Sequence, residues 1–156
     1  DGIRDVERSR GLGDVYKRQV IMGKKDIEEC LAINIQFEKR GGLIPAIAQD
    51  AVSGEILMIG SANQEAFDKT LELGLATFYS TSRNELWTKG LTSGDYLEIT
   101  DVLVDCDQDA LIYQVIRKGS GACHTKSANG KARRSCFYRK LNIDEHKLVW
   151  KSKDLE

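Results

Sequence analysis

The chain has 156 residues, enough for one compact domain and too few for two ordinary ones. Hydrophobic residues make up 41% and charged residues 30%, which is typical of a folded globular protein and excludes a disordered one. Lys plus Arg (23) nearly balance Asp plus Glu (24), so net charge indicates neither a nucleic-acid-binding protein nor an acidic tail. No apolar run reaches a membrane span of roughly 18 residues and no signal peptide is visible, so we expect a cytoplasmic protein without a membrane partner.

The first stretch of the chain differs from the rest. Residues 1–19 are dense in charge and Gly, show no helical or strand period, and precede the first Met, Met22. We therefore expect residues 1–21 to be a disordered leader or non-native read-through that carries no function. Residues 22–156 are expected to form a single domain.

From residue 24 onward, the pattern predicts short strands and few helices. Residues 26–32 are expected to form a short helix, and the alternating Ile33, Ile35 and Phe37 a strand. The other expected strands span residues 43–49, 55–59, 76–82, 96–106, 110–117 and 135–141.

The clearest helix signal begins at Asn63, a good N-cap, and ends at Gly74, where a left-handed residue can close the helix. Strands 43–49 and 55–59 are separated by a five-residue turn that ends in Gly54, which is typical of a hairpin. Together these elements predict an α+β fold with a mostly antiparallel sheet and one or two helices.

Charges are sorted along the second half of the chain. Residues 95–109 contain six carboxylates and no Lys or Arg, whereas residues 118–140 contain seven Lys or Arg and no carboxylate. Such sorting is compatible with two solvated faces of a sheet. It also fits a cation site beside an anion site, as a metal-assisted enzyme with a phosphorylated substrate needs.

The acidic segment ends in Asp105, Asp107 and Asp109. If the preceding strand continues, these alternate residues share one face, and three neighbouring carboxylates require a cation. Oxygen ligands suit a hard ion such as magnesium. The pattern also opens an EF-hand, but the required Gly and Glu of that loop fall on Ala110 and Ile116.

Three cysteines form a second candidate site. Cys106, Cys123 and Cys136 are separated by 16 and 12 residues, which is not the paired spacing of a structural zinc ribbon. Three thiolates would leave a tetrahedral zinc ion one open position, as in catalytic sites, and His124 would be a candidate proton-transfer group. The spacing alone slightly favours buried free cysteines, which behave as small hydrophobic residues. The zinc nucleobase deaminases are excluded, because their H-x-E and P-C-x-x-C motifs do not occur.

Several segments, taken together, resemble the phosphoribosyl-AMP cyclohydrolase family. They lie in that family's order between residues 41 and 141, and their combination is highly specific. The segments are 42–50 (GLIPAIAQD), 80–90 (STSRNELWTKG), 92–94 (TSG), 105–111 (DCDQDAL), 122–125 (ACHT) and 134–139 (RSCFYR).

The resemblance implies a histidine-biosynthesis hydrolase, in its monofunctional form, that opens the N1–C6 bond of the adenine ring of phosphoribosyl-AMP with zinc-activated water. It also implies an intertwined homodimer, in which Cys106 of one subunit meets Cys123 and Cys136 of the other at a shared zinc ion. Asp105, Asp107 and Asp109 would hold magnesium. His124 would be the general base or proton shuttle.

The resemblance further implies a substrate with a phosphate at each ribosyl end, so cationic and hydroxyl groups are needed. Trp87 is a candidate for stacking on the purine and is equally compatible with a place in the core or an interface. The candidate phosphate ligands are Arg83, Lys89, Arg133 and Arg134, with Ser82, Thr92 and Ser93 as hydroxyl donors.

A few positions depart from the family pattern. Leu91 and Ser61 stand where Glu and Tyr are usual, Asp95 stands where Asn is common, and residues 126–131 lengthen the loop between two cysteines. None of these positions is a proposed metal ligand, so they affect the expected substrate contacts and loop geometry.

Two alternatives stay open. One is a non-enzymatic, zinc-stabilised dimer that binds nucleotides or RNA through residues 118–140, where basic side chains flank Phe137 and Tyr138. It gives the three aspartates no function, so we expect no nucleic-acid partner; RNA binding would weaken steeply with salt. The other alternative is a metal-dependent hydrolase of a different purine nucleotide.

Overall fold

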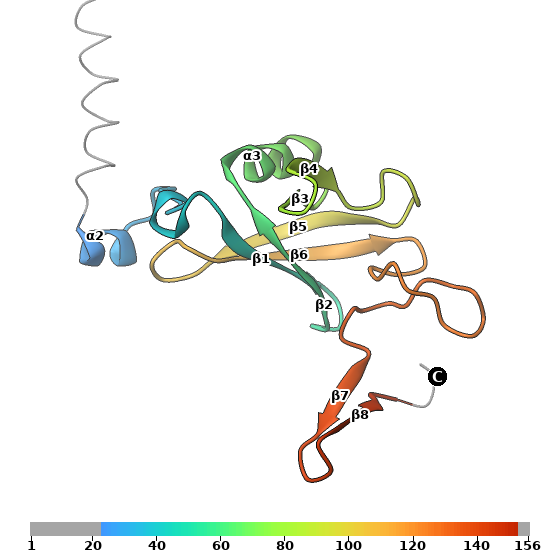
Figure 1. The fold of residues 1–156 in the computed structure, drawn as a ribbon. Coiled ribbons are helices and arrows are strands. Elements are labelled where there is room, and N and C mark those ends of the chain that lie inside the picture. The colour runs from blue at the N-terminus through green and yellow to red at the C-terminus, as the bar shows by residue number, and fades with distance from the viewer. Residues whose placement is uncertain (1–22, 153–156) are drawn as a thin grey trace, which may run out of the picture.

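A six-stranded sheet with the strand order β4-β3-β2-β1-β6-β5 forms the body of the protein (Figure 1). It is seen in a computed structural model that describes residues 23–152, so the expected leader, residues 1–21, lies outside the described residues. Neighbouring strands are antiparallel except β1 and β6, which are parallel. The strands are β1 (Ile44–Asp50), β2 (Ile56–Ala62), β3 (Thr77–Ser80), β4 (Glu85–Thr88), β5 (Tyr96–Val104) and β6 (Leu111–Lys118).

Within residues 23–152, three short helices accompany the sheet: α2 (Lys24–Glu29), the 3-10 helix η1 (Glu38–Arg40) and α3 (Gln64–Leu73). The prediction of an α+β fold with a mostly antiparallel sheet is thus confirmed. None of the helices within residues 23–152 combines the length and the apolar character that crossing a membrane would take.

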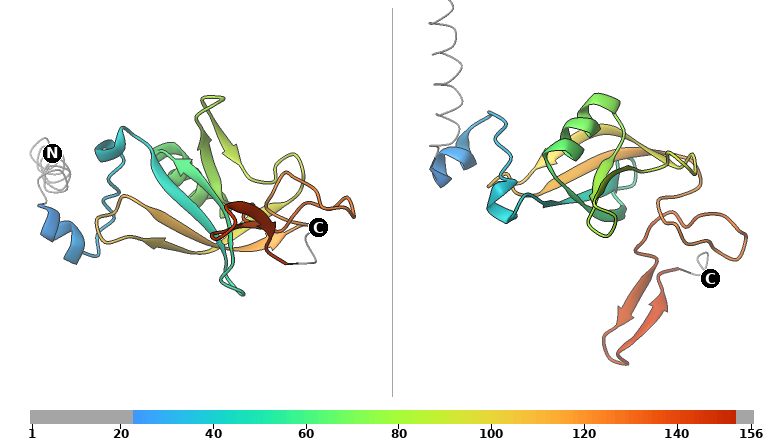
Figure 2. Two further views of the ribbon diagram at one scale, coloured as in Figure 1. Left: turned by 60° about the horizontal axis from the view of Figure 1, so that its bottom comes forward. Right: turned by 45° about the horizontal axis from the view of Figure 1, so that its top comes forward.

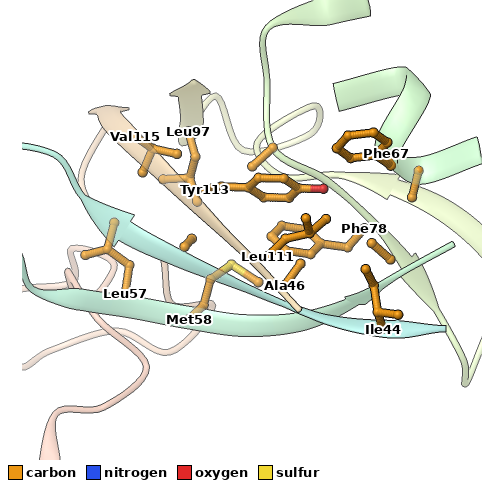
Figure 3. Packing of buried hydrophobic residues seen from close by; sticks show 14 of the residues in the cluster. Ile44, Ala46, Leu57, Met58, Phe67, Phe78, Leu97, Leu111, Tyr113 and Val115 are labelled. Carbon is orange, nitrogen blue, oxygen red and sulfur yellow. The ribbon is translucent and has the colours of Figure 1, made fainter. Parts of the chain in front are cut away.

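The sheet curls until its edge strand β5 meets the segment before β3. The amide of Ala76 donates to the carbonyl of Leu97 (2.9 Å), and the amide of Ile99 donates to the carbonyl of Gly74 (2.8 Å). The core fills the inside of this curl (Figures 2 and 3). Its centre is Tyr113, whose ring centroid lies 5.9 Å from that of Phe78.

Strands β1 and β6 supply the middle of the core because alternate residues of each point inward. The inward side chains are almost fully buried, and the parallel register sets Ala46 beside Leu111 and Ala48 beside Tyr113. The inward set comprises Ile44, Ala46 and Ala48 of β1 and Leu111, Tyr113 and Val115 of β6.

Both predicted ends of the second helix are confirmed. The Asn63 side chain accepts a hydrogen bond from the amide of Ala66 (2.8 Å), and Gly74 ends α3 in the left-handed conformation (φ 67°). The predicted hairpin is confirmed too, with Gly54 (φ 77°) closing the turn between β1 and β2. These predictions from neighbouring residues hold because a helix cap or a tight turn gives hydrogen-bond partners to backbone groups that would otherwise be unpaired.

The structure differs from the sequence prediction in several places. Residues 33–37 form an extended segment rather than a strand, because the amide of Gln36 bonds to the carbonyl of Gln108 in the β5–β6 turn (2.7 Å). The alternation reflects the packing of Ile35 and Phe37 against the core, whereas Ile33 is exposed. Strand β4, in the Ser80–Gly90 motif, was not predicted, and pairs with β3 through a tight turn.

A second, two-stranded sheet consists of β7 (Arg139–Asn142) and β8 (Lys147–Trp150). The predicted strand over residues 135–141 is therefore displaced towards the C-terminus, and its partner β8 was not predicted. This hairpin projects from the body of the protein, and the loop that carries Cys136 joins it to β6 (Figures 1 and 2).

A chain of buried threonines joins α3 to the sheet. The Thr70 hydroxyl donates to the carbonyl of Ala66 (2.9 Å) and accepts from the amide of Thr77 (3.0 Å), and the hydroxyls of Thr77 and Thr88 lie 2.9 Å apart. Thr70→Val would leave a buried amide unpaired and is expected to lower the free energy of unfolding by about 1–3 kcal/mol. Urea unfolding measures this, with Thr70→Ser as the control that keeps the hydroxyl. Equal stability of the two variants would contradict it.

Candidate active site and metal centres

The β5–β6 turn brings three carboxylates together. Within the described part of the chain, Asp105, Asp107 and Asp109 are the one group of three or more potential metal ligands whose ligand atoms all lie within 4.8 Å of one another. The predicted grouping is confirmed, but the predicted cause is wrong, because β5 ends at Val104 and the segment is a turn. Gln108 takes a left-handed conformation within this turn (φ 55°).

Backbone groups and cations compensate for the charge of this cluster. Asp105 accepts hydrogen bonds from the amides of Asp109 and Ala110 (2.8 and 3.0 Å). The Lys39 ammonium contacts Asp107 and Asp109 (2.7 and 2.9 Å), and the Arg40 guanidinium contacts Asp109 (3.1 Å). Two cations therefore face three carboxylates, so the cluster keeps a net negative charge.

These contacts shift the titration of the cluster in opposite directions. Hydrogen bonding to Lys39 holds the pKa of the Asp109 carboxyl well below its usual range, although burial opposes this shift. Burial raises the pKa of Asp105. Hydrogen bonds to Asp107 and then Asp109 raise the pKa of the Lys39 ammonium. Two neighbouring carboxyls thus differ in proton affinity because their surroundings differ.

Cys106 shares this turn and is exposed, whereas Cys123 and Cys136 lie beyond the other end of β6. Strand β6 has eight residues, a length of about 26 Å at 3.3 Å per residue. Within one chain, therefore, Cys106 does not join the other two cysteines. The zinc site shared between two subunits that the resemblance implies is consistent with this separation, and dimerisation itself stays a prediction.

Cys123 and Cys136 lie side by side on two segments that pair with each other. The amide of Cys123 donates to the carbonyl of Arg133, and the amide of Ala122 to that of Arg134 (both 3.0 Å). Burial, and then the neighbouring Cys123, raise the pKa of the Cys136 thiol to about 11, while the charge of Lys89 lowers it. Two close thiols can both ionise only when a cation compensates, so this pair is suited to a soft metal ion.

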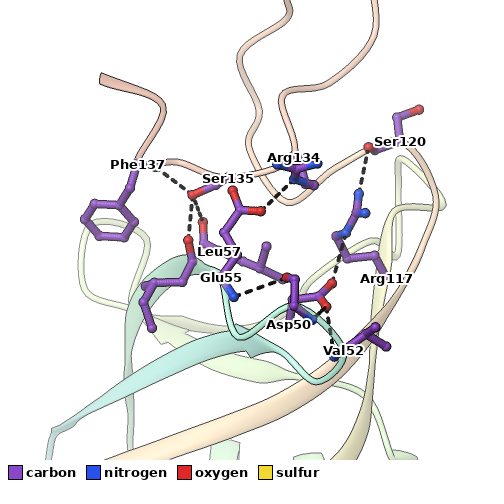
Figure 4. Close-up of polar contacts among 11 residues, drawn as sticks. Asp50, Val52, Glu55, Leu57, Arg117, Ser120, Arg134, Ser135 and Phe137 are labelled. Carbon is purple, nitrogen blue, oxygen red and sulfur yellow. Dashed lines mark hydrogen bonds and ion pairs between the residues drawn. The ribbon is translucent and has the colours of Figure 1, made fainter. Parts of the chain in front are cut away.

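Strand β2 holds the segment that carries Cys136 (Figure 4). The Ser135 hydroxyl donates to the carbonyl of Ile56 (2.6 Å) and accepts from the amide of Phe137 (2.9 Å). The amide of Cys136 donates to the carbonyl of Leu57 (2.7 Å). Because Ser135 is buried (3% exposed), these bonds fix the backbone on both sides of Cys136.

Two ion pairs reinforce this attachment at the start of β2 (Figure 4). The Arg134 guanidinium contacts Glu55 (2.6 Å), and the Arg117 guanidinium contacts Asp50 (3.4 Å). A cavity of about 380 Å³ lies between these side chains. Both arginines thus have carboxylate partners in this structure, and the role of Arg134 as a phosphate ligand stays a prediction.

Glycine allows the close approach of the two cysteine segments. A Cβ at Gly121 would collide with the backbone carbonyl of Arg133, and one at Gly119 would collide with the Asp95 carboxylate. Both positions therefore require a residue without a Cβ. Asp95, a departure from the family pattern, accepts a hydrogen bond from the amide of Ser120 (2.8 Å) and so anchors the same loop.

The remaining substrate candidates on the β3–β4–β5 side are mostly exposed. Ser82 and Arg83 lie in the turn between β3 and β4, where Arg83 is 3.9 Å from Glu85. Thr92 and Ser93 lie in the turn between β4 and β5.

Trp87 is 38% exposed on β4, and its ring centroid lies 5.7 Å from that of Phe78. The indole therefore lies at the edge of the core with one part accessible. Leu91, a departure from the family pattern, is 64% exposed beyond the end of β4, and Ser61 pairs with Tyr79 within the sheet.

Lys89 differs from the other candidates because it is buried (7% exposed). Among the described residues its ammonium has no ion pair, and its charge acts on the Cys136 thiol. Lys89 therefore lies beside the cysteine pair, and its role as a phosphate ligand stays a prediction.

His124 is exposed and directly follows Cys123. Arg133 lies over the rings of Tyr138 (4.3 Å) and Trp150 (5.3 Å), and its Nε atom is buried without a partner among the described residues. The substrate candidates therefore fall on two parts of the chain, the β3–β4–β5 connections and the cysteine loop.

Sequence reasoning missed Lys39, Arg40 and Glu55. The two cations lie about 70 residues before the aspartates that they contact, and no local pattern connects them. Glu55 was interpreted only as part of a strand, and its role depends on the pairing of distant segments.

A family model described as phosphoribosyl-AMP cyclohydrolase matches residues 58–138. A protein of that name from Desulfatibacillum aliphaticivorans is 48% identical over 117 residues, 75% of this chain and 89% of the relative. One from Hyphomonas neptunium is 53% identical, and the match covers 73% of this chain and 81% of the relative. One from Methanothermobacter thermautotrophicus is 45% identical, and the match covers 83% of this chain and 88% of the relative. The chain belongs to the phosphoribosyl-AMP cyclohydrolase family.

Membership makes the protein an enzyme of histidine biosynthesis and excludes the non-enzymatic RNA-binding alternative. The region that matches the cyclohydrolase family model includes both the aspartate turn and the cysteine pair. The family's sequence pattern therefore covers both the aspartate turn and the cysteine pair, which lie at opposite ends of β6.

The Lys39–Asp109 contact predicts a pH-dependent stability difference in metal-free protein. Because the folded-state pKa of Asp109 is depressed, its contribution is complete above the unfolded pKa of about 4 and is lost as pH falls through the folded pKa. Lys39→Met is expected to raise that pKa, so the variant is less stable than the parent near pH 6, and the difference shrinks in strong acid.

Urea unfolding in EDTA at several pH values measures this difference, and carbon-13 NMR of the Asp109 carboxyl follows the pKa directly. Lys140→Met, which changes an exposed lysine on β7, is the control. An unchanged Asp109 titration in Lys39→Met would contradict the prediction.

Proposed function

We propose that this protein hydrolyses the N1–C6 bond of the adenine ring of phosphoribosyl-AMP, giving the formamidine-carboxamide product. The observation that carries the proposal is the cysteine pair Cys123–Cys136, held by β2 with His124 and Lys89 beside it, in a chain of the cyclohydrolase family.

The cysteine pair fits a zinc ion. Cys123 and Cys136 present two thiols on one paired segment, and their mutual charge opposes ionisation until a cation is bound. With Cys106 as the third ligand, zinc would have an open position, and when bound it would lower the pKa of a water molecule to about 7.

The aspartate turn fits magnesium, because it offers only hard oxygen ligands. Asp105, Asp107 and Asp109 would hold the ion. In this structure the carboxylate oxygens of Asp107 and Asp109 contact the Lys39 ammonium. Magnesium would therefore compete with the Lys39 ammonium for those carboxylates.

We propose a homodimer in which Cys106 of one subunit completes the site formed by Cys123 and Cys136 of the other. The length of β6 prevents a single chain from joining them, and a two-fold pairing would form two equivalent sites. This arrangement also puts each aspartate turn beside a cysteine loop of the other subunit.

The chain's own residues would handle the proton and the substrate. His124, exposed next to Cys123, is suited to accept and return a proton during ring opening. Arg83, Ser82, Thr92 and Ser93 lie in exposed turns and are available to phosphate groups. Trp87 presents an accessible indole for stacking on the purine.

Turnover of phosphoribosyl-AMP, followed by its near-ultraviolet absorbance, tests the reaction. Protein supplied with zinc and magnesium is expected to convert the substrate, and Cys106→Ser is expected to lose nearly all activity because the metal loses a ligand. Cys30→Ser is the matched control and should leave turnover unchanged, because Cys30 is not a proposed metal ligand and serine keeps an acceptor for the Gln108 side-chain amide. Absence of turnover in a confirmed dimer supplied with both metals would contradict the proposed activity on phosphoribosyl-AMP.

Mixing two inactive variants tests whether the site is shared. Refolding Cys106→Ser with Cys136→Ser is expected to restore about a quarter of the parent activity, because half of the dimers are mixed and each has one intact site. Each variant alone stays inactive. A mixture as inactive as its components would show that all three cysteines act within one chain or not at all.

A further inference from the structure

Asp95 joins the β4–β5 turn (residues 89–95) to the cysteine loop (residues 119–138). Its carboxylate accepts a hydrogen bond from the amide of Ser120 (2.8 Å), 25 residues further along the chain. Its own amide donates to the hydroxyl of Ser93 (3.2 Å), which is a candidate phosphate ligand. One residue therefore bonds to both parts of the chain that carry the substrate candidates.

Two glycines bring the main chain close to Asp95 on both sides. A Cβ at Gly119 would collide with the Asp95 carboxylate, and a Cβ at Gly90 would collide with the Asp95 carbonyl group. Gly90 has a positive φ of 93°, and its carbonyl accepts a hydrogen bond from the amide of Gly94 (2.8 Å), so the turn closes on itself. The carboxylate is thus held against the cysteine loop by packing as well as by its hydrogen bond.

The Ser120 peptide is also attached to the main sheet. The Arg117 guanidinium donates to the carbonyl of Ser120 (3.3 Å) and contacts the Asp50 carboxylate at the end of β1 (3.4 Å; Figure 4). The start of the cysteine loop is therefore fixed from one side by the sheet and from the other by Asp95.

Two residues separate Ser120 from Cys123, and this short segment is paired. Ala122 and Cys123 are buried (3% and 4% exposed), and their amides donate to the carbonyls of Arg134 and Arg133 (both 3.0 Å). A continuous path of hydrogen bonds and packed backbone thus runs from the β4–β5 turn to the cysteine pair. Such a path can make the position of one loop depend on the other.

The contact with Asp95 leaves Ser93 able to bind a phosphate. A hydroxyl that accepts a hydrogen bond keeps its own proton for donation, and Thr92 and Ser93 are both exposed. In the proposed function, on which this step rests, the phosphate end of the substrate lies at these hydroxyls while its purine lies at the cysteine pair. A fixed distance between the two loops would raise affinity, because the substrate would not have to order them when it binds.

We propose that Asp95 is a positioning residue, which holds the phosphate-binding hydroxyls of the β4–β5 turn at a fixed distance from the cysteine pair. Its partner on the cysteine loop is a backbone amide, so the position requires an acceptor oxygen rather than a negative charge. The side-chain amide of asparagine carries the same acceptor, and Asp95→Asn is therefore expected to preserve the role.

Steady-state kinetics with phosphoribosyl-AMP tests this role. Asp95→Ala is expected to raise KM about 10-fold and to change kcat less than about threefold, because the loops lose their fixed distance while the metal ligands stay. Asp95→Asn is expected to keep KM within about twofold of the parent. Asp68→Ala is the matched control, because it removes an exposed aspartate of α3 that has one hydrogen bond, to Gln64, and it should leave KM unchanged.

Two kinetic results would overturn the positioning role. One is a parent-like KM in Asp95→Ala, even with lowered thermal stability, because the contact would then be merely structural. The other is a KM in Asp95→Asn as high as that in Asp95→Ala, because the position would then require charge.

Nitrogen-15 relaxation of the metal-loaded full chain tests the connection without turnover. The backbone order parameters of Thr92, Ser93 and Ser120 are expected to fall together in Asp95→Ala and to stay at the parent values in Asp95→Asn. A change confined to Ser120 would overturn the connection between the two loops.

The outcomes separate this proposal from the proposed function. Turnover by the parent with an unchanged KM in Asp95→Ala overturns the positioning role and leaves the proposed function intact. Absence of turnover in the parent contradicts the proposed activity and the substrate role of Asp95 with it, and the order parameters still decide whether Asp95 connects the loops.

Discussion

The position of strand β6 is the constraint on which the rest of the structure depends. It pairs in parallel with β1 and antiparallel with β5, and Tyr113 and Val115 are completely buried. Such a strand cannot shift its register without exposing the core. The aspartate turn before it and the cysteine loop after it are therefore held at opposite ends of the sheet, and neither can reach the other within one chain.

Each half of the proposed site is then held in place by a distant segment. The aspartate turn contacts η1, which supplies Lys39 and Arg40, and the cysteine loop is attached to β2 through Ser135 and Glu55. Surface ion pairs contribute little free energy individually. These ion pairs matter because they orient the turns that carry the proposed ligands, and those turns bury few apolar side chains.

The sequence predicted those features that depend on neighbouring residues. The cap at Asn63 and the turn at Gly54 follow from backbone groups a few residues away, and the aspartates lie together because a short turn carries all three. Lys39 could not be found in this way, since its contacts depend on how segments about 70 residues apart meet in space. Residues 33–37 were mistaken for a strand because the packing of the alternate residues Ile35 and Phe37 against the core imitates the alternation of a sheet.

The long loop between the cysteines shows why ligand spacing in sequence was a poor guide to the site. Residues 126–131 fold back on themselves, with the amide of Arg133 bonded to the carbonyl of Thr125 and a bridge between Lys126 and Ala132. The pairing of Cys123 with Arg133 lies below this extension, so extra residues lengthen the loop without moving Cys136. The distance between the two thiols is therefore set by backbone pairing at the base of the loop, and a spacing unlike that of zinc ribbons is compatible with one metal site.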